Sequence, residues 1–223
     1  MRAIFFDAGN TLVFADREKT LAPLLSRGVK IPAETISSAE RAARRFRDAN
    51  AASDPQHTDQ QYWDIYYEEL LAKFPEHRDL IPDLIASTRN SQNWEFVPPG
   101  TREELQKLRN RYRLAIISNS DGRMADLFVR LGLAELFETI TDSGKVGVQK
   151  PHPDIFRAAL QSLNVQPEES VYIGDVYSID YAGARGVGMH AIVMDPFGTY
   201  TQNGVPRVTK LSEIARFLES ASW

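Results

Sequence analysis

The stretch IFFDAGNTLV, residues 4–13, begins as an apolar run and ends in a loop of small residues. Its β-branched and aromatic side chains predict a strand that is buried on both faces, as strands of parallel sheets are. Asp7 follows this strand directly, and a glycine, Gly9, stands two positions later. An aspartate after a strand is a common turn former, so Asp7 becomes informative only through the residues that accompany it.

Three further apolar runs end as abruptly, each near a small or acidic residue. They are LAIISNSD at 114–121, SVYIGD at 170–175 and AIVMDP at 191–196. Helical patterns precede two of them, at 101–111 and 153–163. Strands that alternate with helices at this spacing predict an α/β fold with a doubly wound, Rossmann-like parallel sheet. Such sheets bind ligands at the carboxyl ends of their strands, which here carry Asp7, Ser118 and Asp175.

Residues 17–93 break this alternation, because they contain helical patterns and no convincing strand. Two helical faces collect apolar or aromatic residues: Ile36, Ala39, Ala43 and Phe46 on one, and Trp63, Tyr67, Leu70 and Phe74 on the other. The segment ends at NWEFVPPG, residues 93–100, where two prolines and a glycine disfavour further helix. We therefore expect two domains, an α/β core of residues 1–16 and 94–223 and a helical cap of residues 17–93.

The composition is that of an ordinary globular protein, with 43% hydrophobic and 25% charged residues among 223. A net charge of -4 provides no basic surface for a phosphate polymer, so we expect no nucleic-acid partner. No apolar run approaches the roughly 20 residues that span a bilayer, so we expect no membrane partner and a cytoplasmic location. Without cysteine, any metal must be held by oxygen or imidazole. A monomer or homodimer is expected.

Taken singly, the polar residues at these strand ends have ordinary roles as turn formers, helix caps or surface charges. Their order along the chain resembles the four signature motifs of the haloacid dehalogenase (HAD) superfamily. The matching residues are Asp7, Thr11 and Leu12, then Ser118, then Lys150 with Pro151, and finally Gly174, Asp175 and Asp180. The resemblance covers the whole chain and implies a hydrolase of the magnesium-dependent, phosphatase-like branch, with a helical cap inserted after the first motif.

Phosphoryl transfer needs an in-line nucleophile, neutralised charge and a clamp on the moving group. The resemblance implies that Asp7 is a nucleophile that forms an aspartyl phosphate. The implied Mg²⁺ ligands are Asp7, the backbone carbonyl of Gly9, Asp175 and Asp180, and oxygen ligands of this kind suit the ion. Ser118 and Lys150 are the implied catalytic donors to the phosphate oxygens. The implied substrate-binding residues are Thr11, Ser118, Asn119 and Lys150, and the expected substrate is a small phosphorylated metabolite.

Gly9 departs from the family pattern. The family's phosphatases usually have a second aspartate here, whose side chain serves as general acid and base. Glycine retains the backbone carbonyl but cannot transfer a proton, and such a group is typically worth about 10² to 10⁴ in rate. Four residues are considered as substitutes, and the sequence favours none: Asp16, His57, Asp121 and His152. Asn10 also replaces a common glycine, but asparagine tolerates left-handed backbone angles.

The missing aspartate leaves alternative functions open. A weak or inactive homologue would bind a phosphorylated ligand or a protein partner through the same cleft. A 2-haloacid dehalogenase also lacks this aspartate, but it needs no magnesium, so the retained acids Asp175 and Asp180 argue against it. A phosphonate-cleaving enzyme would use a cap lysine, and neither Lys19 nor Lys73 has a distinctive apolar context.

Substrate specificity is expected to reside in the cap. Tyr62 and Tyr66 fall on a different helical stripe from Trp63 and Tyr67, so the pattern allows them to face the cleft, although aromatic stripes usually form core. Glu40 stands four residues before the arginine at position 44, which is pairing distance on a helix.

Overall fold

The computed structural model describes residues 1–50, 55–201 and 204–220, with the side chains of 55–59 excepted. The chain divides into two compact units. An α/β unit comprises residues 1–14, 97–196 and 202–223, and a helical unit comprises residues 15–96 and 197–201.

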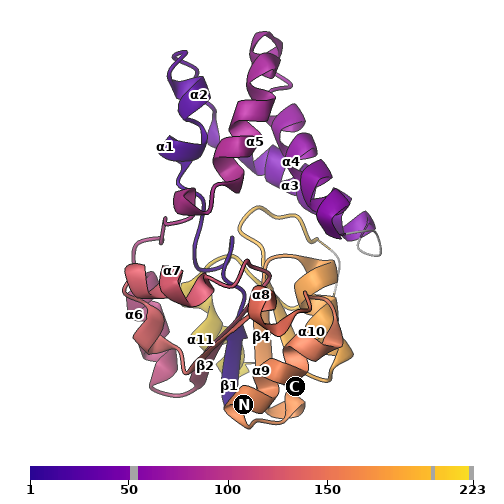
Figure 1. Ribbon diagram of the computed structural model, residues 1–223. Coiled ribbons are helices and arrows are strands. Elements are labelled where there is room, and N and C mark those ends of the chain that lie inside the picture. The colour runs from indigo at the N-terminus through magenta and orange to yellow at the C-terminus, as the bar shows by residue number, and fades with distance from the viewer. Residues whose placement is uncertain (51–54, 202–203, 221–223) are drawn as a thin grey trace. The chain divides into compact units, whose positions relative to one another are not determined.

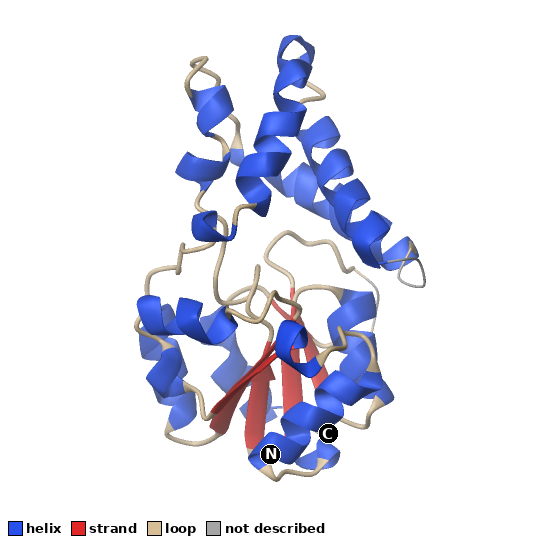
Figure 2. Cartoon of the chain, in the orientation of Figure 1, coloured by secondary structure: helices blue, strands red, loops and turns tan. Residues whose placement is uncertain are grey.

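A parallel sheet forms the centre of the α/β unit (Figures 1 and 2). Its strands are β1 Ala3–Phe6, β2 Arg113–Ser118, β3 Thr139–Asp142, β4 Ser170–Gly174, β5 His190–Met194 and β6 Arg207–Val208. Their order across the sheet is β3-β2-β1-β4-β5-β6, and every neighbouring pair is parallel. The predicted doubly wound α/β fold and its four predicted strands are thereby confirmed. The sequence did not predict β3 or β6.

Helices cover both faces of this sheet, because successive side chains of a strand point to opposite sides. The helices of the α/β unit are α6 Thr101–Arg109, α7 Met124–Arg130, α8 Ser143–Val146, α9 Pro153–Leu163, α10 Ala182–Gly186 and α11 Ile214–Ser220. Ile4 and Phe6 of β1 share one buried core with side chains of α6, α7 and α11. Ala3 and Phe5 share another core with side chains of α9 and α10. The side chains of β1 therefore pack alternately into the hydrophobic cores on the two faces of the sheet.

Shorter turns of helix complete the α/β unit. They are the 3₁₀ turns η3 Ala134–Leu136, η4 Pro167–Glu169 and η6 Leu211–Glu213, and the π-helix η5 Tyr177–Tyr181. α9 begins where the sequence predicts it, because Pro153 occupies its first turn and His152 Nδ1 accepts a hydrogen bond from the Asp154 backbone N–H at 3.3 Å.

The helical unit has a core of its own. Its helices are α1 Arg17–Thr20, α2 Ala22–Leu25, α3 Ala33–Ala49, α4 Pro55–Leu70 and α5 Ile81–Arg89, with 3₁₀ turns η1 Pro75–Leu80 and η2 Ser91–Asn93. Ala39 and Ala43 of α3 are fully buried in this core with Leu70 of α4. The described residues between 17 and 93 contain no strand. Among the described residues, no helix combines the length and the apolar character that crossing a membrane requires.

Tyr62 and Tyr66 lie in a core and do not face a cleft, which the sequence pattern had allowed. Both are buried in the core of the helical unit, with 2% and 8% of their surface exposed. The Tyr62 hydroxyl donates to a Glu40 carboxylate oxygen at 3.2 Å, and the same carboxylate lies 3.5 Å from Nε of the buried Arg44. The polar tip of Tyr62 is therefore satisfied inside the core, so the ring needs no solvent-facing position.

Residues 197–201, which follow β5, group with the helical unit. The sequence-based division placed this segment in the α/β core. Arg41 of α3 donates to the backbone carbonyl of Phe197 at 3.2 Å, and the Arg44 guanidinium lies 5.1 Å from the centre of the Phe197 ring. A hydrogen bond and a cation–π contact thus attach the segment to α3, and neither contact has a local sequence pattern.

Candidate active site

The site lies at the point where the strand order reverses. The chain builds the sheet outward from β1 to β3 and then returns to place β4 on the other side of β1. Asp7 follows β1 and Asp175 follows β4, and the Asp7 backbone N–H donates to the Ile173 carbonyl at 2.8 Å. Ligands of doubly wound sheets bind at such a reversal, outside the carboxyl ends of the strands.

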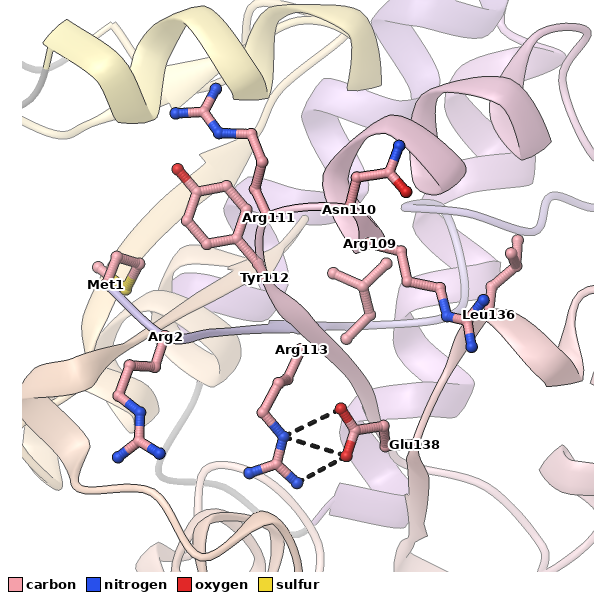
Figure 3. A pocket seen from close by; sticks show the side chains of 10 residues that line it. Met1, Arg2, Arg109, Asn110, Arg111, Tyr112, Arg113, Leu136 and Glu138 are labelled. Atoms are coloured by element: carbon pink, nitrogen blue, oxygen red, sulfur yellow. Dashed lines mark hydrogen bonds and ion pairs between the residues drawn. The ribbon is translucent and has the colours of Figure 1, made fainter.

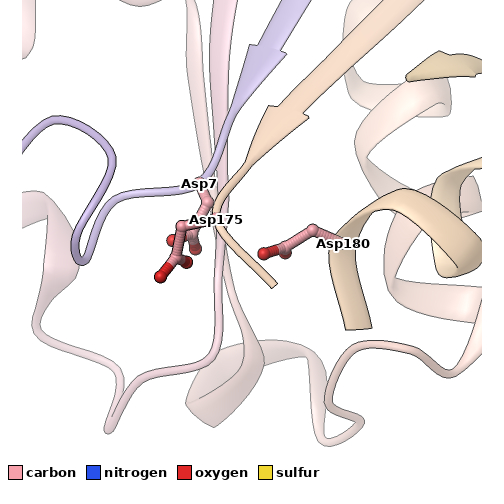
Figure 4. Close-up of side chains that lie close together, drawn as sticks. All are labelled: Asp7, Asp175 and Asp180. Carbon is pink, nitrogen blue, oxygen red and sulfur yellow. The ribbon is translucent and has the colours of Figure 1, made fainter. Parts of the chain in front are cut away.

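Three carboxylates meet there. Each of Asp7, Asp175 and Asp180 offers one oxygen, and these oxygens all lie within 4.8 Å of one another. Figure 4 shows Asp7 and Asp175 together at the strand ends, with the side chain of Asp180 directed toward them from the neighbouring helical turn. All three residues are buried, with 7%, 5% and 3% of their surface exposed. This all-oxygen donor set fits a hard cation such as Mg²⁺.

Lys150 supplies positive charge to this cluster. Its Nζ atom donates to Asp7 Oδ1 at 2.6 Å and to Asp180 Oδ1 at 2.8 Å, and the side chain is buried with them. Burial alone would lower the pKa of Lys150, but Asp180 and Asp7 outweigh it and raise that pKa above its ordinary value. The lysine therefore remains an ammonium group, not the solvated surface charge that its sequence position suggests.

The pKa of Asp7 moves in the opposite sense from an ordinary ion-paired carboxylate. Burial raises it, Lys150 opposes the rise and the nearby Asp180 carboxylate adds to it, and the net result is a pKa of about 6. Asp7 is thus a carboxylate whose charge depends on the cations beside it.

The loop after Asp7 folds back on itself. Ala8 O accepts backbone hydrogen bonds from Leu12 and Val13, each at 2.9 Å, and Gly9 forms a β-bridge with Val13. Asn10 adopts the left-handed conformation with φ of 54°, as the sequence allows. The buried hydroxyl of Thr11 lies 3.5 Å from Asp7 Oδ2, at the outer limit of a hydrogen bond. Gly9 itself is half-buried and brings no side chain to the cluster.

Ser118 and Asn119 lie at the same edge of the sheet. Ser118 is the buried last residue of β2, the strand that pairs with β1. The side-chain amide of Asn119 makes two hydrogen bonds to the backbone of Lys150. Its Nδ2 donates to the Lys150 carbonyl at 3.0 Å, and its Oδ1 accepts from the Lys150 N–H at 2.7 Å. The amide therefore fixes the lysine's backbone, a contact that the sequence did not indicate.

Asp142 is a structural support that the sequence analysis missed. It ends β3, is 2% exposed, and accepts backbone N–H bonds from Gly122 at 3.0 Å, Gly144 at 2.9 Å and Met124 at 3.0 Å. One carboxylate thus holds the loop after Ser118 against the loop after β3. Only recognition of β3 as a strand could have drawn attention to this residue.

Tyr172 is the second residue that sequence reasoning missed. It lies in the middle of β4, is fully buried, and its hydroxyl oxygen is 2.7 Å from Lys150 Nζ. The hydroxyl also lies 3.1 Å from both Asp180 Oδ1 and the Ile117 carbonyl. Burial and the charges of Asp180 and Asp7 raise the pKa of Tyr172 well above its ordinary value, so the phenol stays neutral. A tyrosine inside a strand otherwise indicates only β propensity.

The substitutes considered for the missing acid have other roles where they are described. Asp16 caps α1 by accepting from the Glu18 N–H at 2.9 Å. The exposed Asp121 pairs with the Arg123 guanidinium, which lowers the pKa of its carboxyl. His152 caps α9 as described above. The side chain of His57 lies outside the described part of the chain. None of the three described residues is shown to take the place of an acid at position 9.

A pocket of about 610 Å³ lies at the opposite, amino-terminal edge of the sheet (Figure 3). Arg2 precedes β1, Arg113 begins β2 and Glu138 precedes β3, so the pocket is remote from the acidic cluster along the strands. Arg113 donates to both carboxylate oxygens of Glu138, and Arg2 pairs with Glu169 at 3.1 Å. These guanidinium groups are already engaged in surface ion pairs.

The model of the haloacid dehalogenase-like hydrolase family matches residues 1–188, which is most of the chain. The chain belongs to this family. The matched region contains every residue by which the sequence resembles the family's four motifs, from Asp7 to Asp180.

Two relatives extend the comparison over nearly the whole chain. A mouse (Mus musculus) protein, haloacid dehalogenase-like hydrolase domain-containing protein 3, is 30% identical over 98% of this chain and 92% of its own length. A glyceraldehyde 3-phosphate phosphatase of Methanothermobacter thermautotrophicus is 28% identical over 87% of this chain and 86% of its own length.

Solved structures share the HAD fold. A HAD-hydrolase of Bacillus subtilis, crystallised bound to magnesium, has a TM-score of 0.67 at 17% identity and covers 97% of this chain and 98% of its own. A 2-haloacid dehalogenase of Pseudomonas syringae has a TM-score of 0.60 at 22% identity, with 98% of each chain covered. Because hydrolases of different substrates share this fold, the fold does not choose between a phosphatase and a dehalogenase.

Proposed function

We propose that this HAD-like hydrolase is a magnesium-dependent phosphatase of small phosphorylated metabolites. The observation that carries the proposal is the buried trio Asp7, Asp175 and Asp180, with ligand oxygens within 4.8 Å of one another. Such a cluster has a use in phosphoryl transfer, where a cation must offset the charges of the enzyme and the substrate. The similarity to a glyceraldehyde 3-phosphate phosphatase supports the proposal and makes glyceraldehyde 3-phosphate the first substrate to test.

Asp7 is the nucleophile in this proposal. One carboxylate oxygen attacks phosphorus and forms a P–O bond, while the P–O bond to the leaving alkoxide breaks. Water then attacks phosphorus, the bond to Asp7 breaks, and inorganic phosphate leaves with the carboxylate restored. The attack requires ionised Asp7, and the Lys150 ammonium at 2.6 Å favours that form.

The other residues hold the phosphate and the cation. Asp7, Asp175, Asp180 and the Gly9 carbonyl would hold Mg²⁺, which supplies charge neutralisation when bound. Ser118 would donate to a nonbridging phosphate oxygen. Lys150, whose three N–H donors reach Asp7, Tyr172 and Asp180, would donate to another by exchanging one of its two carboxylate acceptors for the phosphate. Thr11 and Asn119 would contribute to substrate binding, and Asn119 already fixes the Lys150 backbone. A cytoplasmic location and a monomeric or homodimeric state stay predictions.

Gly9 limits this chemistry in both of its steps. The leaving alkoxide needs a proton, and the second step needs a base for water, yet a glycine can serve as neither. Turnover should therefore depend on the leaving group, because an alcohol of low pKa departs without an acid.

The test is hydrolysis of a panel of phosphorylated metabolites with added Mg²⁺. Wild type should release inorganic phosphate, and Asp7→Asn should release none above background, because the covalent step is lost. Asp126→Asn, on the exposed face of α7, is the matched control and should keep wild-type turnover. Activity of Asp7→Asn equal to that of wild type would exclude Asp7 as the nucleophile.

The same preparation separates two alternative functions. Gly9 favours a phospholigand-binding homologue. Such a protein would bind a phosphorylated compound tightly but would hydrolyse no compound of the panel. A 2-haloacid dehalogenase predicts halide release from 2-haloacids without added Mg²⁺. The buried acidic trio disfavours the dehalogenase, because halide displacement needs no cation site.

A further inference from the structure

We propose that Tyr172 is the positioning residue that holds the Lys150 ammonium between Asp7 and Asp180. The inference rests on the proposed function, in which Lys150 acts on the substrate's phosphate. It adds to that function a residue in the middle of a strand, away from the loops that carry the four motifs.

The hydrogen bonds of Lys150 define the role. An ammonium group has three N–H donors, and the Lys150 donors reach three acceptors: Asp7 Oδ1 at 2.6 Å, Tyr172 Oη at 2.7 Å and Asp180 Oδ1 at 2.8 Å. The tyrosine hydroxyl is the neutral acceptor of the three. Without it, one donor of a buried ammonium would have no partner, and the group would move toward one of the two carboxylates.

The hydroxyl is itself fixed from two sides. Its single proton can be donated to the Ile117 carbonyl or to Asp180 Oδ1, each 3.1 Å away. Ile117 immediately precedes Ser118 in β2, so one hydroxyl connects the segments that carry Ser118, Lys150 and Asp180. Because the backbone carbonyl is always available, Tyr172 can keep its position when the Asp180 oxygen is engaged elsewhere.

Packing holds the ring in this orientation. The Phe156 ring of α9 lies edge-on to the Tyr172 ring, with centroids 5.4 Å apart and planes at 79°. The Phe156 ring also lies close to α10, because a Cβ atom at Gly183 would be only 2.8 Å from it. Phe156 is therefore packed between α10 and the Tyr172 ring, and this close packing restricts the rotation of the tyrosine away from Lys150.

Tyr172→Phe tests the inference, because it removes the hydroxyl and retains the ring. The measurement is calorimetric binding of inorganic phosphate at saturating Mg²⁺. We expect phosphate affinity to fall about tenfold, the usual effect of losing one hydrogen bond to a charged group. Tyr112→Phe, at the amino-terminal edge of the sheet, is the matched control and should bind phosphate as wild type does. Unchanged affinity in Tyr172→Phe would overturn the proposal.

A double-mutant cycle separates positioning from a general loss of structure. If Tyr172 acts through Lys150, adding Tyr172→Phe to Lys150→Met should change phosphate affinity by less than about twofold. An equal tenfold loss in both backgrounds would show that Tyr172 acts independently of the ammonium, and it would overturn the proposal.

A crystal structure of Tyr172→Phe gives a readout that needs no ligand. We expect Lys150 Nζ to lie beyond hydrogen-bond distance, about 3.5 Å, from either Asp7 or Asp180. An ammonium still bonded to both carboxylates would overturn the positioning role. If wild type bound neither Mg²⁺ nor phosphate, the proposed function would fail, and this structure would still decide the role of Tyr172.

Discussion

The Asp180 carboxylate occupies the space that a side chain at Gly174 would need. A Cβ atom at position 174 would lie 2.6 Å from both Cβ and Oδ2 of Asp180. Asp180 Oδ2 also accepts from the Val176 N–H at 3.0 Å, so the carboxylate is held against the end of β4. The glycine before Asp175 therefore has a specific purpose, which is to let Asp180 approach the other two acids.

Gly174→Ala should displace Asp180 and weaken metal binding. The added methyl group cannot be accommodated without movement of the Asp180 side chain or of β4, so we expect Mg²⁺ affinity to fall at least about tenfold through loss of one ligand. Calorimetric titration with Mg²⁺ measures this. Gly186→Ala in α10 is the matched control, because nothing lies within 4 Å of its added Cβ. Equal Mg²⁺ affinity in the two variants would contradict the prediction.

Asp142→Asn should destabilise the α/β unit. The asparagine oxygen can replace Oδ1, but its amide would face the Met124 N–H, which now donates to Oδ2. Two donors would then meet in a buried place, which costs about 1–3 kcal/mol in the free energy of unfolding. Urea denaturation measures the loss. The unfolding free energy of Asp126→Asn, at an exposed position of α7, should stay within about 0.5 kcal/mol of wild type. A comparable loss in Asp126→Asn would mean that the hydrogen bonds of Asp142 are not the source of the effect.

Glu138→Gln should reduce stability at neutral pH but not in acid. Its bond to Arg113 lowers the pKa of the Glu138 carboxyl, so the charged form is favoured in the folded state. The resulting stabilisation is present above the unfolded pKa of about 4.3 and is lost as pH falls through the lower folded pKa. Because both partners are partly exposed, the difference should be at most about 1 kcal/mol.

Urea denaturation at pH 7 and pH 3 measures this difference. The unfolding free energies of wild type and Glu138→Gln should differ at pH 7 and converge at pH 3. Glu103→Gln on the exposed face of α6 is the control for the loss of a charge. A difference that is the same at both pH values would mean that the ion pair with Arg113 is not its source.

The sequence predicted the centre of the sheet better than its edges. β1, β2, β4 and β5 are continuous apolar runs, because both of their faces are covered by helices. β3 is an edge strand whose Thr139 and Ile140 are half-buried, and β6 has two residues, so neither forms such a run. An edge strand has less to bury and therefore leaves a weaker pattern.

The residues of the candidate site likewise fall into those that the sequence could identify and those that it could not. Residues at strand ends, such as Asp7 and Asp175, were identifiable because the sheet's topology brings strand ends together. Tyr172 and Asp142 were not, because their roles depend on atoms that are distant in sequence: Tyr172 contacts the main chain 55 residues earlier. Long-range hydrogen bonds of this kind leave no local periodicity.

Gly9→Asp should raise turnover where the leaving group is poor. Gly9 follows the nucleophile by two residues in the loop that bridges to Val13, so a carboxylic acid there would supply the proton that the alkoxide lacks. For an alkyl phosphate such as glyceraldehyde 3-phosphate, the gain in kcat/KM, which reports the steps up to loss of the leaving group and not the later hydrolysis of the aspartyl phosphate, should approach the usual worth of a general acid, about 10² to 10⁴. With 4-nitrophenyl phosphate, whose leaving group needs no proton, the gain should be small.

The ratio of these two gains is the decisive measurement, because it reports proton transfer and not a general change in folding or metal affinity. Gly9→Asn is the matched control, since it has nearly the shape of aspartate but no acidic proton, and it should give no gain with either substrate. Equal gains for both variants would assign the effect to loop geometry. No gain for Gly9→Asp, with phosphate affinity intact, would mean that another group already supplies the proton or that binding is the role of this site.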